Sequence, residues 1–509
     1  MSAWCYVLAW AATLAAQLLQ LPYAGQLAGL AILLFLLAEF RNQRRYAQAL
    51  FLALLGIGMA GVAAAPHPVE LFLDAWRRGA SYAAFFLALT TLRDAAETSR
   101  LVRRCGRHLV AQPPGRRYAA LTAGGHVFGI ILSYGAIELL AAMVARANDA
   151  DTATAAPTRA LRARRMLMAI YRGFCVMNCW SPLNIMTAVV STAVPAAPMP
   201  LLLPIAFVVS VGMAALGWLE DRLSAARRAT RAPLSAPPFG TPPFRAPSGV
   251  PRPGAPSGTP LSSAPSGATP PGTRSGATDP WSIHFRIIAL VGLVMLLAEG
   301  LSRGARITLV TAVTLVVPSV AIAWLLVQLR HQQPRLILPM LGRRLARFRQ
   351  RIPGFRAEAT VLAASGFMAF ALAGAFPAAG LAPLLAWLPP LALPLLVPVV
   401  LIASGQIGLN PVAVVALLGA AVPDPAALGV PPAVLAFAFM LSWGLGVGMT
   451  PMSASAITTA RWAGVAPWTV STVWNAAFTL SSLLLAWAAI AALFLLAPQV
   501  FASAPPAAG

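Results

Sequence analysis

The sequence predicts an all-α integral membrane protein. Its 509 residues are 59% hydrophobic and only 10% charged, whereas soluble domains have about 25% charged residues. The apolar residues form blocks of about 20, which is the length that crosses a bilayer as a helix. Nearly all charged residues lie between these blocks. A water-soluble globular domain is therefore excluded, and we expect a chain that crosses the membrane many times.

The first half of the chain is expected to contain membrane helices and one hairpin. The apolar blocks predict helices near residues 4–20, 24–40, 46–65, 76–92, 166–194 and 201–219. An Arg-rich amphipathic stretch at 93–117 should lie at the membrane surface. Residues 118–145 are apolar but contain several glycines, and arginines flank both ends. Such a segment is expected to enter and leave the membrane on one side, as a re-entrant hairpin.

The second half repeats this order after a linker. Residues 224–280 are rich in Pro, Ser, Gly, Ala and Thr without hydrophobic periodicity, which is typical of a disordered segment. The blocks that follow predict helices near 284–300, 306–329, 357–376, 432–460 and 467–497, an amphipathic stretch at 332–356 and a second hairpin at 390–430. The expected domains are thus an N-terminal membrane repeat (1–223), the linker (224–280) and a C-terminal membrane repeat (281–509).

The positions of the arginines predict the orientation. The formal net charge is +23, and all 37 basic residues are arginine. If the linker and the Arg-rich loops are cytoplasmic, only Arg77, Arg78, Arg303 and Arg306 lie on the outer side, which leaves 33 of 37 inside. Membrane anchoring explains this charge more simply than nucleic-acid binding does. We expect a multi-pass protein of a bacterial-type inner membrane, with its N-terminus inside and its C-terminus outside.

This orientation makes the two halves run in opposite directions, as inverted repeats with eleven transmembrane helices and two re-entrant hairpins. The helix after each hairpin is interrupted, once at Ser181-Pro182-Leu183-Asn184 and once at Thr450-Pro451-Met452-Ser453. The two prolines lie 269 residues apart, and the hairpin tips, taken at Tyr134 and Leu409, lie 275 residues apart. One duplication accounts for both spacings. A simple proline kink remains the alternative for each break.

The paired breaks and tips predict a binding site at mid-membrane. The N-termini of half-helices have partial positive charge that can hold an anionic substrate, and freed carbonyls with hydroxyl and amide oxygens can coordinate Na⁺ or guide a proton. The candidate substrate- or ion-binding residues are Ser133, Tyr134, Gly135, Ser181, Pro182, Asn184, Asn410, Thr450, Pro451, Ser453 and Ser455.

This arrangement resembles the ion transporter superfamily, and within it the divalent anion/sodium symporter family. Members of that family have eleven helices and two opposed hairpins, form dimers, and act as elevator-type carriers of dicarboxylates and citrate. Their hairpin tips have Ser-Asn-Thr, and Ser133 and Asn410 match it in part. Their helix breaks have a Gly-Thr-Pro-Pro-Asn-like turn, which Ser181-Pro182-Leu183-Asn184 and Thr450-Pro451 resemble. The tips of this chain offer fewer side-chain oxygens, which favours coupling to protons or exchange over coupling to Na⁺.

A few ionisable and polar side chains at membrane depth are candidates for a proton or charge role, because such groups are costly there. Glu138 follows the first tip by one helical turn and is the candidate proton carrier, since desolvation would favour its protonated form. Arg172 and Asn178 precede the first break. Arg172 could pair with Glu138, hold a substrate carboxylate or extend to the cytoplasmic interface. His126 could relay protons or be bonded to backbone.

These features predict a secondary active transporter of a small organic anion, coupled to H⁺ or Na⁺ or working by exchange. The expected partners are that substrate, the lipid bilayer and, from the resemblance, a second copy of the chain, with no nucleic acid. Motifs of hydrolases, metalloproteases and phosphate loops are absent from the sequence, so we expect neither an enzyme nor a bound cofactor or metal. A channel or a structural membrane protein is the alternative, and an intramembrane enzyme is less favoured.

The topology can be tested by the accessibility of single cysteines in a cysteine-free background. We expect a cysteine at Gly509 to react with an impermeant reagent from the periplasm, and a cysteine at Ser257 to react only from the cytoplasm. Labelling of Gly509 from the cytoplasm, or of Ser257 from the periplasm, would contradict the predicted orientation.

Overall fold

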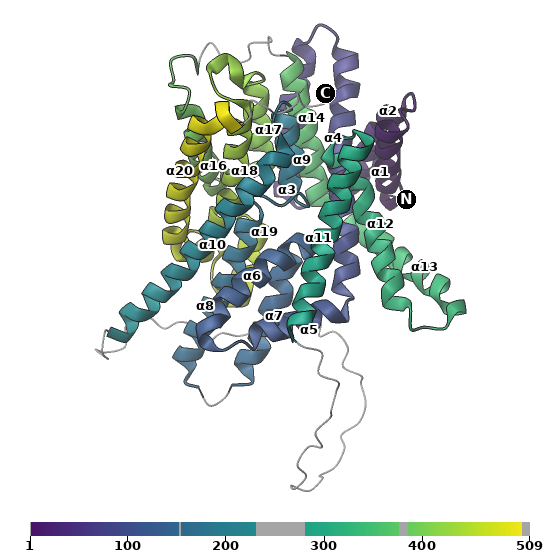
Figure 1. Cartoon of the computed structure of the whole chain (residues 1–509). Coiled ribbons are helices and arrows are strands. Elements are labelled where there is room, and N and C mark those ends of the chain that lie inside the picture. Colours follow the sequence, from purple (N-terminus) through teal and green to yellow (C-terminus); the bar gives the residue numbers. More distant parts are fainter. Residues whose placement is uncertain (1, 152–153, 231–279, 376–384, 501–509) are drawn as a thin grey trace.

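The computed structural model describes residues 2–151, 154–230, 280–375 and 385–500, and these residues form an all-helical protein without strands (Figure 1). The prediction of an all-α fold is confirmed for this part of the chain. In the N-terminal half the helices are α1 (Ser2–Leu18), α2 (Ala24–Glu39), α3 (Arg45–Ala64), α4 (Pro68–Glu97), α5 (Arg100–Val110), α6 (Pro114–Leu132), α7 (Gly135–Asp149), α8 (Ala156–Met177), α9 (Ile185–Ala193) and α10 (Met199–Thr230).

The C-terminal half also contains long helices, a pair of short helices and an interrupted helix. Its helices are α11 (Pro280–Ala305), α12 (Leu309–Leu329), α13 (Pro334–Arg351), α14 (Arg356–Ala375), α16 (Ala392–Gln406), α17 (Pro411–Ala421), α18 (Pro432–Met449), α19 (Ala454–Ala463) and α20 (Ala476–Val500), with a π-helical turn at Thr469–Trp474. Short 3₁₀ turns lie at Phe40–Asn42, Ile352–Phe355 and Pro425–Leu428.

The predicted apolar blocks lie in helices of the described residues, with differences at several boundaries, among them the start of α8 at Ala156 rather than near 166. Helix α4 begins at Pro68 rather than near 76, because Pro at the first helical position and Glu70 in the first turn favour a helix start there. Helix α10 continues to Thr230, past the predicted linker boundary at 224, because the intervening residues include good helix formers, Ala and Arg. The rest of the predicted linker, residues 231–279, lies outside the described residues.

Eight helical stretches among the described residues are long and apolar enough to cross a membrane, judged by length and composition. They are α2, α3, α10, α11, α12, α20 and the two stretches α13–α14 and α18–α19. Helix α1 has only 17 residues, although it is apolar. The chain is thus a multi-pass helical membrane protein, while the predicted number of eleven spans stays a prediction.

The Arg-rich stretch 93–117 differs from the single surface segment that the sequence predicted. Its first residues end α4, its middle forms α5 and its last residues begin α6. The apolar side of α5 is buried against α6, α7 and α11, with Val102, Cys105 and Leu109 in the core. The apolar face of α5 is therefore covered by protein rather than by lipid, and its arginines face outward.

Two hydrophobic clusters hold the fold together. The smaller cluster joins α1, α2, α3, α14, one side of α4 and two alanines of α17, and includes Phe35, Trp76 and Phe367. The Trp76 and Phe367 rings stack with centroids 4.7 Å apart. The larger cluster joins the paired helices α6–α7 and α16–α17 with the interrupted helices α8–α9 and α18–α19, and extends to α4, α5, α10, α11, α12 and α20. The paired and interrupted helices therefore share one core.

Helix α8 crosses α6 at a contact between backbones. A Cβ atom on Gly125 would overlap the carbonyl oxygen of Ile170, and one on Gly173 would overlap the carbonyl oxygen of Thr122. Glycine is needed at both positions because no side chain fits between the two helices. Close to this crossing, Gly129 faces Phe174 and Met177, which sets the end of α6 beside the end of α8.

The substitution Gly173→Ala tests this crossing. Although Ala favours a helix over Gly by about 1 kcal/mol, we expect a net loss of about 1–3 kcal/mol in the free energy of unfolding, because the backbones must separate. Gly292→Ala in α11 is the matched control, since its added Cβ would meet open space. Unfolding of the purified protein in detergent measures both. Equal stability of the two variants would contradict the proposed backbone contact.

Candidate functional site

The first break separates α8 from α9 and is held by its own polar side chains. Asn184 caps α9 by accepting from the Met186 N–H at 2.9 Å, and its amide donates to Asn178 Oδ1 at 2.5 Å. Asn178 in turn donates to the Phe174 carbonyl at 2.7 Å. The Ser181 carbonyl accepts from Thr187 Oγ1 at 3.0 Å. Ser181 and Pro182 are buried, so this turn lies inside the protein.

The second break separates α18 from α19 and leaves the carbonyls of Val447, Gly448 and Met449 without their helical partners, the first because Pro451 has no N–H. The N–H groups of Met452 and Ser453 bond to the Oγ1 and carbonyl oxygen of Thr450, so the carbonyls of Gly448 and Met449 lose these donors. Side chains replace them. Asn475 and Tyr171 donate to the Gly448 carbonyl at 2.9 and 3.0 Å.

The Met449 carbonyl accepts from Gln406 Nε2 at 2.6 Å, and Gln406 belongs to the tip of the α16–α17 pair. Thr450 Oγ1 donates to the Gly405 carbonyl at 2.6 Å. Asn410 caps α17 by accepting from Val412 N–H at 2.9 Å, and Gly408 adopts a φ of 87° that favours glycine. The second tip and the second break therefore form one hydrogen-bonded unit, which includes Asn410, Thr450 and Pro451.

Ser453 and Ser455 complete this unit at the start of α19. Ser453 Oγ caps the helix by accepting from the Ala456 N–H at 3.1 Å, and it also accepts from Ser455 Oγ at 3.0 Å. Each of the three half-helices α9, α17 and α19 thus begins with a capping side chain, Asn184, Asn410 or Ser453.

The two interrupted helices cross just before their breaks. A Cβ atom on Gly444 would overlap Cys179 Sγ, and one on Gly448 would lie 3.3 Å from Cys175 Sγ. Cys179 Sγ contacts the Leu441 carbonyl at 3.6 Å. Two glycines four residues apart on α18 therefore pack against two cysteines four residues apart on α8. Because Cys179 meets Gly444 and Cys175 meets Gly448, the two helices run antiparallel here, and the first and second breaks lie on either side of the crossing.

The first tip lies in a different environment from the second. Ser133 is exposed and has a φ of 51°, which is uncommon for a residue with a side chain. The Tyr134 ring lies under the Arg93 guanidinium at 4.4 Å, and its hydroxyl donates to Glu358 Oε1 at 3.4 Å. A Cβ on Gly135 would meet Arg93. The contacts of this tip thus connect it to α4 and α14, whereas those of the second tip connect it to the second break and, through the bond from the Tyr46 hydroxyl to the Gly408 carbonyl, to α3.

Arg172 is buried, and four hydrogen bonds hold its guanidinium. The guanidinium donates to Tyr118 Oη, Glu220 Oε1 and Asn475 Oδ1, each at 3.1 Å, and to the Trp474 carbonyl at 3.2 Å. It pairs with Glu220 rather than with Glu138. Asn475 also bonds to the second break, so Arg172 connects α6, α10 and the π-helical turn to that break.

Glu138 is part of a contact between α7 and α19. Its carboxylate accepts from Trp462 Nε1 at 2.8 Å and lies 3.4 Å from Arg461. The cation beside Glu138 is thus Arg461, whereas Arg172, which the sequence offered as a possible partner, pairs with Glu220. His126 Nε2 accepts from Trp180 Nε1 at 2.8 Å, and the two rings stack. His126 is thus bonded to a side chain of the first break rather than to backbone.

Sequence reasoning missed several residues that complete these contacts. They are Tyr171, Gln406, Thr472 and Asn475 at the second break, and Arg93, Tyr118, Glu220 and Glu358 around Arg172 and the first tip. A polar residue within an apolar block, such as Asn475, was the available signal. Among the described residues, no group of three or more His, Cys, Asp or Glu side chains is placed to hold a metal ion.

Comparison with known proteins finds no protein family and no curated protein that matches the chain. Among solved structures, the chain is similar to the YdaH transporter of Alcanivorax borkumensis, whose crystal structure is described as having an unusual topology. The TM-score is 0.48 and the identity 14%, over 90% of this chain and 98% of that one. This similarity establishes neither a family nor a function, so the proposal below rests on the geometry described above.

Replacing Arg172 should reveal a structural role. We expect Arg172→Gln to lower the free energy of unfolding by about 3 kcal/mol, because Glu220 and Asn475 lose a buried partner. Arg303→Gln, which breaks the exposed pair with Glu299, should cost less than about 1 kcal/mol. Denaturant unfolding in detergent compares the two. A stable Arg172→Gln protein would contradict this assignment and favour direct contact of Arg172 with substrate.

Proposed function

We propose that the chain is a secondary active transporter that moves a small organic anion of the carboxylate type across a bacterial inner membrane. The observation that supports this most is the crossing of two interrupted helices, α8 and α18, next to a helical tip that bonds to one of the breaks. Interrupted backbone at membrane depth is tolerated where it is buried in protein or lines a water-filled cavity, and transporters use such breaks to bind substrate.

The substrate would bind where the half-helices begin. The first turns of α9, α17 and α19 provide N–H groups and partial positive charge, which favour a carboxylate. The proposed binding residues are those predicted from the sequence around Ser181, Asn184, Asn410, Thr450 and Ser453, with Ser133 and Tyr134 at the first tip. Gln406 and Thr472 join this set, because they bond to each other and to the second break.

An elevator movement is the proposed mechanism. Most core residues of the paired and interrupted helices lie in the larger hydrophobic cluster, together with parts of α4, α5, α11 and α12, while α1, α2, α3 and most of α14 form the smaller one, with Ala413 and Ala416 of α17. This division supports a moving transport domain that slides against a fixed scaffold. The placement of α6–α7 low and α16–α17 high in Figure 1 supports two inverted repeats with hairpins that enter from opposite sides.

Coupling to H⁺, coupling to Na⁺ and exchange are the three proposed sources of energy. A Na⁺ ion needs several oxygen ligands, but the carbonyls of Gly448 and Met449 already accept side-chain donors. Binding of Na⁺ there would have to displace Asn475 or Gln406. A proton role for Glu138 would require the carboxylate to leave Arg461 and Trp462 in each cycle. Exchange needs neither change.

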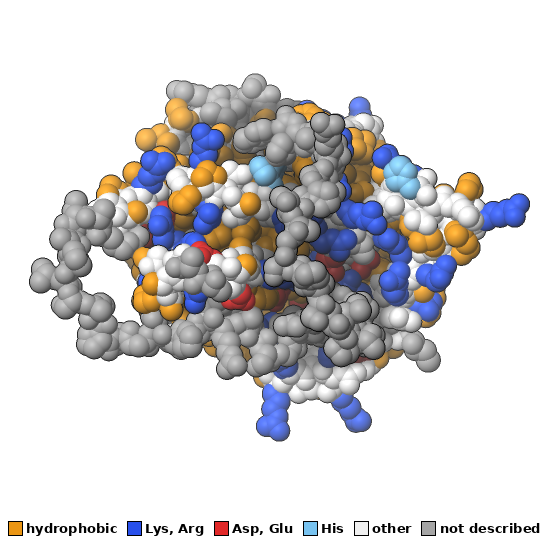
Figure 2. Space-filling view, turned by 90° about the horizontal axis from the view of Figure 1, so that it is seen from below, with side chains coloured by type: hydrophobic (Ala, Val, Ile, Leu, Met, Phe, Trp, Pro, Cys, Tyr) orange, Lys and Arg blue, Asp and Glu red, His pale blue; other side chains and the backbone are white. Residues whose placement is uncertain are grey.

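The positions of the arginines support the proposed orientation of the protein in the membrane. The end of the molecule that contains α5, α7 and the ends of α10 and α11 would face the cytoplasm, as would the N-terminus, and the C-terminus would lie outside. Figure 2 looks onto this end and shows many arginines around its rim. We further propose a homodimer. A channel or a structural membrane protein is the competing function, and an enzyme is less favoured.

Reconstitution into liposomes separates these functions. A carrier should show saturable counterflow of a labelled di- or tricarboxylate without ATP, a channel should show ionic conductance, and an enzyme should convert substrate without moving it. Thr450→Val should reduce counterflow at least tenfold, because it removes the bond between the second break and the second tip.

Thr314→Val is the matched control, since Thr314 Oγ1 bonds only within α12, to the Val310 carbonyl. It should transport like the wild type. Uptake that needs ATP after ion gradients have been collapsed would contradict a secondary carrier. Conductance without saturable counterflow would favour a channel.

A further inference from the structure

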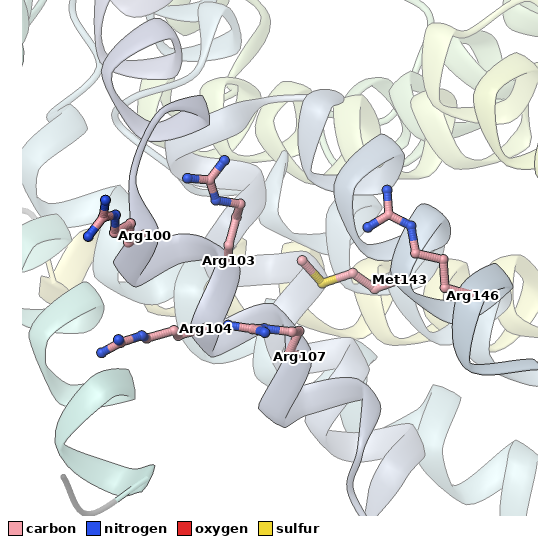
Figure 3. A pocket seen from close by; sticks show the side chains of 6 residues that line it. All are labelled: Arg100, Arg103, Arg104, Arg107, Met143 and Arg146. Carbon is pink, nitrogen blue, oxygen red and sulfur yellow. The ribbon is translucent and has the colours of Figure 1, made fainter. Parts of the chain in front are cut away.

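A pocket lined by five arginines lies between α5 and α7, away from the proposed substrate site. Its lining residues are Arg100, Arg103, Arg104 and Arg107 of α5 with Met143 and Arg146 of α7, and its volume is about 460 Å³. In Figure 3, Met143 and Arg146 lie opposite the arginines of α5. The volume is within the range of about 300–1,000 Å³ that small-molecule sites occupy.

The pocket is held by packed side chains on its apolar side. Gly106 allows Met143 to approach α5, because a Cβ on Gly106 would lie 2.8 Å from Met143 Sδ. Cys105, Leu109 and Leu140 are buried beneath. The α5 backbone therefore has a defined position relative to α7, and its arginines line the pocket, with Arg100 and Arg104 pointing away from Met143 and Arg146 in Figure 3.

The five arginines have no acidic partners among the described residues. Most acidic side chains of the neighbouring segments are used elsewhere: Asp94 and Glu97 pair with Arg351, Asp151 pairs with Arg162, and Glu138 pairs with Arg461. Asp149, three residues after Arg146 on α7, forms no ion pair with a described residue. No ion pair or side-chain hydrogen bond of the described residues includes a pocket arginine. The like charges repel one another, and a multivalent anion would relieve that repulsion.

The lining suits a multivalent anion, and a phosphate group is one that fits it. Arginine forms paired hydrogen bonds with phosphate oxygens through its planar guanidinium, and a cluster of arginines suits a group with several negative charges. Met143 is the only apolar side chain in the lining, so it provides no wall for an acyl chain. Recognition must therefore depend on the charged group itself.

We propose that this pocket binds a phosphate-bearing anion, which bridges α5 and α7. The phosphate belongs either to the headgroup of an anionic phospholipid at the membrane surface or to a soluble polyphosphate compound. Since α7 is the second arm of the first helical hairpin, the bound anion connects that hairpin to α5 and stabilises their contact. Basic pockets at the ends of membrane helices bind lipid headgroups in this way.

Binding can be measured on the purified full-length protein without transport. The first arm adds dioleoylphosphatidylglycerol or dioleoylphosphatidylcholine, and the second adds inorganic tripolyphosphate or, at equal ionic strength, sodium chloride. Thermal unfolding and native mass spectrometry record the response. We expect phosphatidylglycerol, tripolyphosphate or both to raise Tm, and phosphatidylcholine and chloride to have no such effect.

The test variant is Arg103→Gln/Arg104→Gln/Arg107→Gln. Its matched control is Arg335→Gln/Arg343→Gln/Arg347→Gln, which removes three exposed arginines from α13 and so has the same net charge. The pocket variant should bind the phosphate compound at least tenfold more weakly, and the α13 variant should bind like the wild type. Because the three pocket arginines are exposed, their loss should leave the fold intact.

Each outcome decides the proposal. A pocket-dependent response to phosphatidylglycerol alone assigns the phosphate to a lipid headgroup. A response to tripolyphosphate alone assigns it to a soluble compound, and a response to both means that the pocket accepts either source. No response to either compound, or equal losses in the two variants, would overturn the proposal. If the triple variant fails to fold, Arg146→Gln on α7 alone should still weaken binding, and unchanged binding would overturn the site.

Discussion

The close crossing of α8 and α18 is the contact on which the rest of the structure depends. Gly444 and Gly448 leave room on α18 for Cys175 and Cys179 on α8, so that the two interrupted helices cross in close contact between their breaks. Unpaired backbone groups are costly at membrane depth, and each break would be unstable if it faced lipid. The crossing buries the breaks in protein, where side chains from other elements can replace the lost helical bonds.

Those replacement bonds connect the breaks to the whole molecule. Tyr171 and Asn475 bond to the Gly448 carbonyl, and Gln406 bonds to the Met449 carbonyl. Asn475 in turn accepts a hydrogen bond from the Arg172 guanidinium, which also donates to the Glu220 carboxylate. A movement of the second tip would therefore break identifiable hydrogen bonds rather than a diffuse apolar contact. The proposed transport cycle would therefore break and re-form a specific set of hydrogen bonds.

Much of the fold could be predicted from the sequence, because hydrophobic blocks and prolines are local signals. The helices, the breaks at Pro182 and Pro451, and the contact between the second tip and the second break required only periodicity and turn chemistry. The partners of Arg172 and the environment of the first tip could not be predicted in this way. Tyr118, Glu220 and Asn475 come from distant segments, and only tertiary packing brings them together. The same is true of α5, whose amphipathic pattern is equally consistent with a lipid surface and with the protein core that covers it.

The central claim is that the second tip and the second break line a site that opens to each side of the membrane in turn. Single cysteines at Ile407 and Met452, whose side chains are 77% and 61% exposed, test it directly with an impermeant thiol reagent. Alternating access predicts that each cysteine reacts when reagent is applied from the cytoplasmic side and also when it is applied from the outer side. Reaction from one side only, under every gradient and substrate condition, would contradict the account.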